Sequence, residues 1–261
     1  MAAPRPGRRP GRTTALVTGA GQGIGAAIAE TLARAGHAVA AVDRCEDTVR
    51  AVAARLRRRR LVARAFVADV SRSADVARLL EQVDAELGPV SILVNNAGVG
   101  GPFHRVDQVS DEEWDWIFHT NVKSVLHFCR PLLPAMKQRG FGRVINIASI
   151  QGLVGAARSS TYVASKHAMI GYTRAIAAEW GPFGITCNAI CPGYVETRMG
   201  IQEEAVSGQR RRVLARTPTR RVATPEEIAY LVLSLVDDRA GHVNGSVLVA
   251  DGGILADAGV S

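Results

Sequence analysis

The chain has 261 residues, 47% of them hydrophobic, which is enough for one substantial core. Its formal charge of +8 comes almost wholly from arginines that no aromatic residues interleave, so we expect no nucleic-acid partner. No apolar run reaches the ~20 residues of a membrane-spanning helix, and no signal-peptide pattern follows the basic N-terminus. We therefore expect a cytoplasmic protein without a membrane partner.

The predicted elements alternate between strands and helices. Residues 1–12 are rich in Pro, Gly and Arg and are expected to form a disordered basic tail, whereas residues 13–261 are expected to form one domain. Consecutive apolar residues indicate strands that helices cover on both faces. The fold class is therefore α/β, a Rossmann fold with a doubly wound parallel sheet of about seven strands. The predicted strands are Ala15–Val17, Ala38–Val42, Leu61–Val67, Ile92–Val94, Val144–Ile147, Ile185–Ile190 and Val247–Val249.

Three helix starts can be predicted from local signals. Three consecutive acidic residues that begin at Asp111 predict the N-terminus of a helix that runs to about Met136, because negative charge is stabilised at the positive end of the helix dipole. A second helix is expected from about Thr161 to Trp180. Thr224 is a predicted N-cap before a helix that includes Ile228 to Leu235.

A glycine-rich turn follows the first strand and precedes the first helix. Because glycine has no side chain, the backbone of such a turn can approach a pyrophosphate, which then meets free N–H groups at the helix N-terminus. Asp43 ends the second strand, where a carboxylate can bind the adenosine ribose and repel a 2′-phosphate. This favours NAD over NADP, although the neighbouring Arg44 could pair with such a phosphate. The turn residues expected to bind the cofactor are Gly19, Gln22, Gly23, Ile24 and Gly25.

Tyr162 and Lys166 are four residues apart in the predicted second helix and share one face. An ammonium near a phenol stabilises the phenolate, which brings a group with an ordinary pKa near ~10 toward proton transfer at neutral pH. Alone, this spacing is common by chance. It occurs here together with the run Asn95-Asn96-Ala97-Gly98, with Asn121, and with Ser149 at the end of a strand.

With Pro192-Gly193, these motifs resemble the short-chain dehydrogenase/reductase family from about Thr14 to Gly253. The resemblance implies that Ser149 holds the substrate oxygen and that Tyr162 transfers its proton. It also implies that Lys166 lowers the pKa of Tyr162 and binds the nicotinamide ribose. Asn121 would support a water in the proton relay. Tyr162 and Lys166 would also contact the cofactor, as would Asp69, Val70, Asn95, Ala97, Gly98, Pro192, Gly193, Val195 and Thr197.

The resemblance also implies a homotetramer and a substrate lid at about 197–216. The substrate is expected to be a small alcohol or ketone, with Ser149, Gln151, Arg158 and Met199 at its pocket. Arg158 or the run Arg210 to Arg212 could engage an anionic group, although a solvated surface is the preferred interpretation of the run. No cysteine spacing is typical of zinc, so we expect no metal and interpret Cys45, Cys129, Cys187 and Cys191 as buried reduced thiols.

The function expected is NAD(H)-dependent interconversion of a secondary alcohol and a ketone. Segments around Lys166 and from Cys187 to Thr197 resemble polyketide ketoreductases and 3-hydroxybutyrate dehydrogenases. The latter carry a histidine where this chain has Gln151 and a lysine where it has Ser159. Two alternatives stay open: an NADPH-dependent 3-oxoacyl-thioester or polyketide ketoreductase, and an NAD-sensing scaffold without catalysis.

Overall fold

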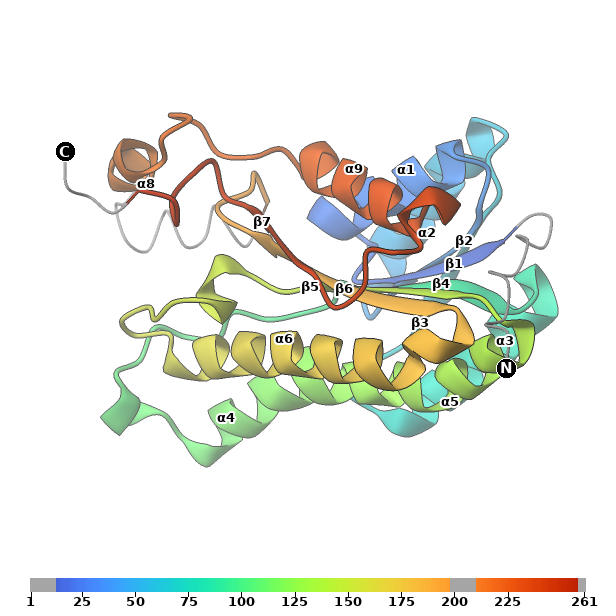
Figure 1. Cartoon of the computed structure of the whole chain (residues 1–261), viewed down its shortest axis with the longest axis horizontal. Helices are drawn as coiled ribbons and strands as arrows, with labels where there is room; N and C mark the ends of the chain where they lie inside the picture. The colour runs from blue at the N-terminus through green and yellow to red at the C-terminus, as the bar shows by residue number, and fades with distance from the viewer. Residues whose placement is uncertain (1–12, 198–209, 258–261) are drawn as a thin grey trace.

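A computed structural model describes residues 13–197 and 210–257 as one three-layer unit, in which a parallel sheet lies between two layers of helices (Figure 1). The expected tail, residues 1–12, lies outside the described residues, as does most of the expected lid. No helix in the described ranges has the length and apolar character needed to cross a bilayer.

All seven predicted strands are present and pair in parallel. Several extend one or two residues beyond the apolar runs, because polar end residues such as Asp43 and Asn95 still pair with the neighbouring strand. The third strand starts later than predicted, since the Leu61 N–H closes the preceding helix on the Leu56 carbonyl. The strands are β1 (Thr14–Thr18), β2 (Ala38–Asp43), β3 (Ala63–Val67), β4 (Val90–Asn95), β5 (Gly142–Ile147), β6 (Ile185–Pro192) and β7 (Val247–Ala250).

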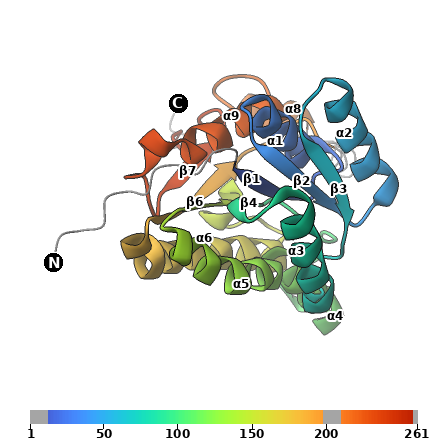
Figure 2. The same cartoon turned by 90° about the vertical axis from the view of Figure 1, so that its right-hand side faces the viewer.

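The strand order is β3-β2-β1-β4-β5-β6-β7, so the order reverses between β1 and β4. Figure 2 shows this sheet nearly end-on, with α1, α2 and α9 on one face and α3, α5 and α6 on the other. In such sheets the ligand crevice lies at the carboxyl ends of the strands beside the reversal. The helices are α1 (Gly23–Arg34), α2 (Glu46–Arg58), α3 (Ser73–Leu87), α4 (Asp111–Phe118), α5 (Ser124–Arg139), α6 (Ser160–Trp180), α8 (Arg210–Arg216) and α9 (Pro225–Val236).

The core has two halves, one on each face of the sheet. Successive strand residues point to opposite faces, so Leu16 packs toward α3, α5 and α6 while Val17 packs toward α1, α2 and α9. Both faces of the central strands are therefore buried, which explains their continuous apolar sequence. This core fixes the strand ends on which the site residues stand.

The predicted helix from Asp111 to Met136 is wrong in one respect. A π-helical segment, His119–Lys123, separates α4 from α5, and α5 continues to Arg139. An extra residue in a helical turn shifts the register of the side chains that follow, and such turns are frequent at functional sites. Asn121 lies in this segment and is fully buried.

The predictions for the other elements hold with small changes. Thr224 caps α9 as expected, since its side chain accepts a hydrogen bond from the Glu227 N–H. The four cysteines are free thiols, but only Cys129, Cys187 and Cys191 are buried; Cys45 is exposed, because it starts α2 at the surface.

Candidate active site

The turn after β1 is shaped for close approach of a ligand. Gly19 has a φ of +65°, and a Cβ added to Gly25 would lie 2.1 Å from the Gly19 carbonyl oxygen. Helix α1 begins at Gly23, and its N-cap residue Gln22 makes no side-chain capping hydrogen bond. The N-terminal N–H groups of α1 are thus not capped by Gln22, which fits the pyrophosphate of a dinucleotide cofactor.

Asp43 is held rigidly at the end of β2. Its Oδ2 accepts a hydrogen bond of 2.9 Å from the Gly21 N–H, and its Oδ1 accepts one of 3.0 Å from the Cys45 N–H. Arg44 lies beside it in the same cavity wall. The wall therefore offers both a carboxylate and a guanidinium where the second strand ends.

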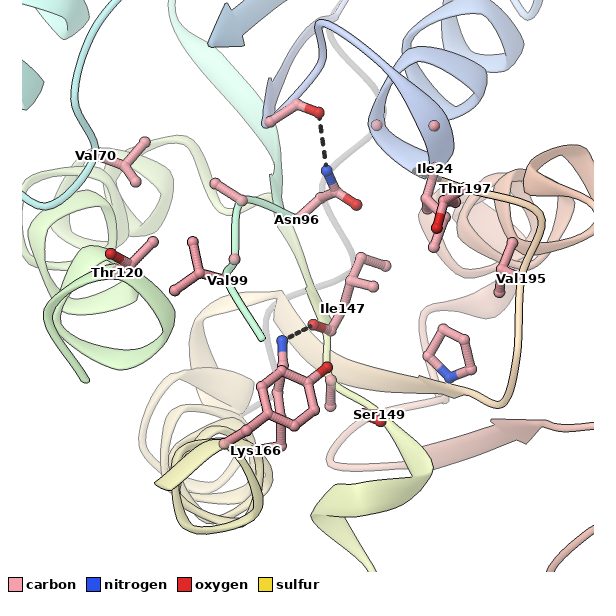
Figure 3. Close-up of a pocket in the computed structure, with 18 of the residues that line it drawn as sticks. Ile24, Val70, Asn96, Val99, Thr120, Ile147, Ser149, Lys166, Val195 and Thr197 are labelled. Atoms are coloured by element: carbon pink, nitrogen blue, oxygen red, sulfur yellow. Dashed lines mark hydrogen bonds between the residues drawn. The ribbon is translucent and has the colours of Figure 1, made fainter. Parts of the chain in front are cut away.

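One cavity of about 350 Å³ runs along the carboxyl ends of β1, β4, β5 and β6. Figure 3 shows it, with Thr120 and Val99 on one side and Val195 and Thr197 on the other. The predicted residues that line it are Gly19, Gln22, Gly23, Ile24, Gly25, Asp43, Asp69, Val70, Ala97, Gly98, Ser149, Gln151, Tyr162, Lys166, Pro192, Gly193, Val195 and Thr197.

Asn95 is not among the lining residues, contrary to the prediction. It is still part of β4 and buried, and its Nδ2 donates a hydrogen bond of 2.8 Å to the Asn146 Oδ1. The following residue, Asn96, lines the cavity instead (Figure 3), and its Nδ2 donates to the Thr18 carbonyl at 2.8 Å and to the Gly19 carbonyl at 3.2 Å. The strand ends between the two asparagines, so Asn95 stays buried in β4 while Asn96 reaches the cavity wall.

Asn121 lies behind the wall and does not line the cavity. Its Oδ1 accepts a hydrogen bond from the Val99 N–H at 2.8 Å, and its Nδ2 donates to the Val99 carbonyl at 2.9 Å and to the Ser165 Oγ at 3.1 Å. It thereby fastens the loop after β4 to α6. We therefore place Asn121 as a positioning residue, while its expected support of a water stays a prediction.

Tyr162 and Lys166 project from α6 into the cavity, as their spacing predicted. The Lys166 Nζ lies 5.5 Å from the centre of the Tyr162 ring and donates a hydrogen bond of 2.9 Å to the Ile147 carbonyl (Figure 3). Burial lowers the pKa of Lys166 to about 8. The ammonium is still the main form at neutral pH, so a positive charge lies beside the phenol.

Ser149 follows β5 and stands at the start of a short 3₁₀ helix, Ile150–Gly152. Its Oγ accepts a hydrogen bond of 3.1 Å from the Gln151 N–H, which leaves its own hydroxyl hydrogen free to turn toward a ligand. Ser149, Tyr162 and Lys166 thus meet in one cavity with the glycine-rich turn and Asp43.

Of the predicted substrate residues, Arg158 does not line the cavity, and the prediction for Met199 stays untested. Arg158 is exposed, has a φ of +64°, and is absent from the cavity wall, because the loop before α6 turns it outward. Met199 lies outside the described residues, as do the side chains of Arg210 to Arg212.

Sequence reasoning missed Trp116, Thr120 and Tyr194, which also line the cavity. Trp116 and Thr120 are one helical turn apart and lie shortly before Asn121, and this spacing is the signal that could have identified them.

No group of three or more potential metal ligands occurs in the described part of the chain.

Comparison with known proteins assigns the family. A family model described as enoyl-(acyl carrier protein) reductase matches residues 19–255. The chain is 40% identical over 178 residues to acetoacetyl-CoA reductase of Rhizobium meliloti (strain 1021), covering 67% of this chain and 71% of that protein. It is 38% identical over 201 residues to D-beta-hydroxybutyrate dehydrogenase of the same organism, covering 71% and 76%.

A solved structure gives the same result. It is a single-substitution variant of actinorhodin polyketide ketoreductase with NADPH, and it matches with a TM-score of 0.90 at 35% identity, covering 93% of this chain and 97% of that chain. The chain therefore belongs to the short-chain dehydrogenase/reductase family, as its motifs predicted, and is an oxidoreductase that acts on hydroxyl or keto groups.

Proposed function

We propose that the protein interconverts a secondary alcohol and a ketone with NAD(H), and that Tyr162 is the general acid and base. The observation that carries this proposal is the convergence of Ser149, Tyr162 and Lys166 on the cavity that the glycine-rich turn and Asp43 also line. A bound nicotinamide would accept or supply the hydride.

The residues of the chain would then handle the proton. Ser149 donates a hydrogen bond to the substrate oxygen, and Tyr162 takes the hydroxyl proton in oxidation or returns it in reduction. The buried ammonium of Lys166, held on the Ile147 carbonyl, stabilises the phenolate form of Tyr162. Asn121 links the loop after β4 to α6, so that the cavity wall and Tyr162 stay aligned.

The preference for NAD rests on Asp43. Its two oxygens are fixed by backbone N–H groups, so the carboxylate cannot easily move away from a 2′-phosphate placed near it. Two fixed negative charges at close range repel, whereas the two hydroxyls of an unphosphorylated ribose can donate hydrogen bonds to a carboxylate.

A second candidate is an NADPH-dependent ketoreductase that acts on a 3-oxoacyl thioester or a polyketide. Arg44 favours it, because this guanidinium also lines the cavity and could pair with a 2′-phosphate. The match to an NADPH-bound ketoreductase structure supports the same alternative.

One titration separates the two candidates. Purified protein is titrated with NADH and with NADPH, and nicotinamide fluorescence reports binding. We expect NADH to bind at least about tenfold more tightly, a difference of about 1.4 kcal/mol. The Asp43→Ser variant should lose this preference, and Arg44→Ala serves as the matched control. Tighter NADPH binding that Arg44→Ala abolishes would instead establish the ketoreductase, and binding of neither cofactor would contradict both.

We also propose that the protein is a homotetramer in which α4, α5 and α6 form one interface. Trp114 supports this, since it stacks on Phe118 at a centroid distance of 4.6 Å and is still 43% exposed. Light scattering coupled to size exclusion measures the mass directly, and a monomeric mass would contradict the proposal.

A further inference from the structure

Trp116 belongs to the wall of the cavity that Ser149 and Tyr162 also line. It lines the wall together with Thr120, and 44% of its surface is exposed. Its neighbour Ile117 is only 1% exposed and anchors α4 in the core. Trp114 stacks on Phe118, whereas no aromatic partner of Trp116 is found in the part of the chain that the structure describes. The exposed part of the Trp116 side chain is therefore available to a ligand.

The wall that carries Trp116 is fixed in place by three contacts. The His104 Nδ1 lies 2.7 Å from the Glu113 Oε2, which ties the loop after β4 to α4. His104 also forms an isolated parallel bridge with Ser159 at the start of α6. A Cβ on Gly101 would lie 2.5 Å from the Ile117 Cδ1, so this loop packs directly on α4. A wall that is rigid before binding loses little entropy when it orders a ligand.

Gln151 lines the same cavity two residues after Ser149. Its backbone N–H donates to the Ser149 Oγ, so its position is tied to the hydroxyl that holds the reacting oxygen. The Gln151 Oε1 is buried and has no hydrogen-bond partner among the described residues. The last torsion of a glutamine side chain turns easily, and a turn exchanges the positions of the oxygen and the NH2 group of this cavity-lining side chain, so that either group can meet a ligand. An acceptor without a donor is costly when buried, so a ligand that donates a hydrogen bond there gains affinity.

We propose that Trp116 and Gln151 are specificity-determining residues, and that they select a ring alcohol with a second hydroxyl on the carbon beside the reacting one. This inference rests on the proposed function. The ring lies against the indole of Trp116, Ser149 and Tyr162 hold the reacting oxygen, and the Gln151 Oε1 accepts a hydrogen bond from the neighbouring hydroxyl.

The reaction balances without a further reactant. Oxidation of the reacting CH–OH group transfers one hydride to the oxidised nicotinamide and one proton to Tyr162, and a C=O bond forms. The neighbouring hydroxyl is unchanged, so a cyclic vicinal diol gives a hydroxyketone. Reduction of the hydroxyketone reverses each transfer.

Three probe alcohols test the two residues separately. They are 2-butanol, which has no ring, 1-indanol, which has a ring and one hydroxyl, and cis-1,2-indanediol, which has both features. Oxidation is followed with whichever nicotinamide cofactor the protein binds more tightly. We expect kcat/KM to rise in that order, because each probe adds one of the proposed contacts.

The variants are judged by ratios between probes, which a merely structural defect would leave unaltered. Trp116→Ala should lower the ratio of 1-indanol to 2-butanol by about tenfold, whereas the matched control Trp116→Phe should retain most of it. Gln151→Met, which keeps the size but removes the amide, should lower the ratio of diol to 1-indanol by about fivefold.

The outcomes separate this inference from the function on which it rests. Protein that binds neither NADH nor NADPH would overturn the proposed function itself. Protein that binds cofactor but oxidises neither indane probe, or oxidises both no better than 2-butanol, would overturn the specificity proposal alone. Ratios that Trp116→Ala and Gln151→Met leave unaltered would overturn it as well.

Discussion

Lys166 should reduce the stability of the cofactor-free protein, and removing its charge should reverse this effect. Burial lowers the pKa of Lys166 from 10.5 to about 8. At 1.36 kcal/mol for each pH unit, the protonated lysine costs the folded state about 3 kcal/mol at pH 7. Lys166→Met has a similar length and no charge, but it removes the hydrogen bond to the Ile147 carbonyl, at a cost of about 1–2 kcal/mol. We expect the variant to be more stable by about 1–2 kcal/mol and to be inactive.

The pH dependence gives the sharper test. Between pH 8 and 10.5 the unfolded chain holds a proton on Lys166 that the folded chain has released. The free energy of unfolding of the wild type therefore rises with pH in this window relative to that of the variant. The wild type should therefore regain about 2 kcal/mol of its free energy of unfolding between pH 7 and pH 10, relative to the variant.

Urea unfolding of both proteins at pH 7, 8, 9 and 10 measures this difference, since all other titrating groups are shared. Lys166→Arg, which stays charged across the range, is the control and should be less stable than the wild type at every pH. A difference between the wild type and Lys166→Met that stays constant from pH 7 to pH 10 would refute the argument that burial perturbs Lys166.

Other substitutions test the remaining parts of the site. Tyr162→Phe should lower kcat at least about a hundredfold, because no other group supplies the proton, while the Kd for NADH stays within about threefold; an active variant would exclude Tyr162 as the general acid and base. Gly25→Ala should abolish cofactor binding, since its Cβ would meet the Gly19 carbonyl at 2.1 Å, whereas Gly171→Ala, with nothing within 4 Å, should stabilise the fold by about 1 kcal/mol. Asn121→Ala removes three hydrogen bonds and should lower Tm and kcat together; an unchanged Tm would argue against its positioning role.

The sequence by itself determined the fold class and most of the residues that line the cavity. Seven apolar runs became seven parallel strands, because a strand covered on both faces must be apolar at consecutive positions. The glycine-rich turn, Asp43, Ser149, Tyr162 and Lys166 could be predicted because each stands at a strand end or at a fixed helical spacing. Local spacing is enough to place such residues.

Only the tertiary structure decided which polar residues face the cavity. Asn95 and Asn96 are adjacent in sequence, yet the strand directs Asn95 to a buried contact with Asn146 and leaves Asn96 in the wall. The π-helical turn places Asn121 behind Val99, and no local pattern predicted it. Trp116 and Gln151 line one cavity because packing joins α4, β5 and α6. Contacts between segments distant in the chain depend on this packing, which is why the sequence predicted Gln151 at the pocket but not the side chains that share the cavity with it.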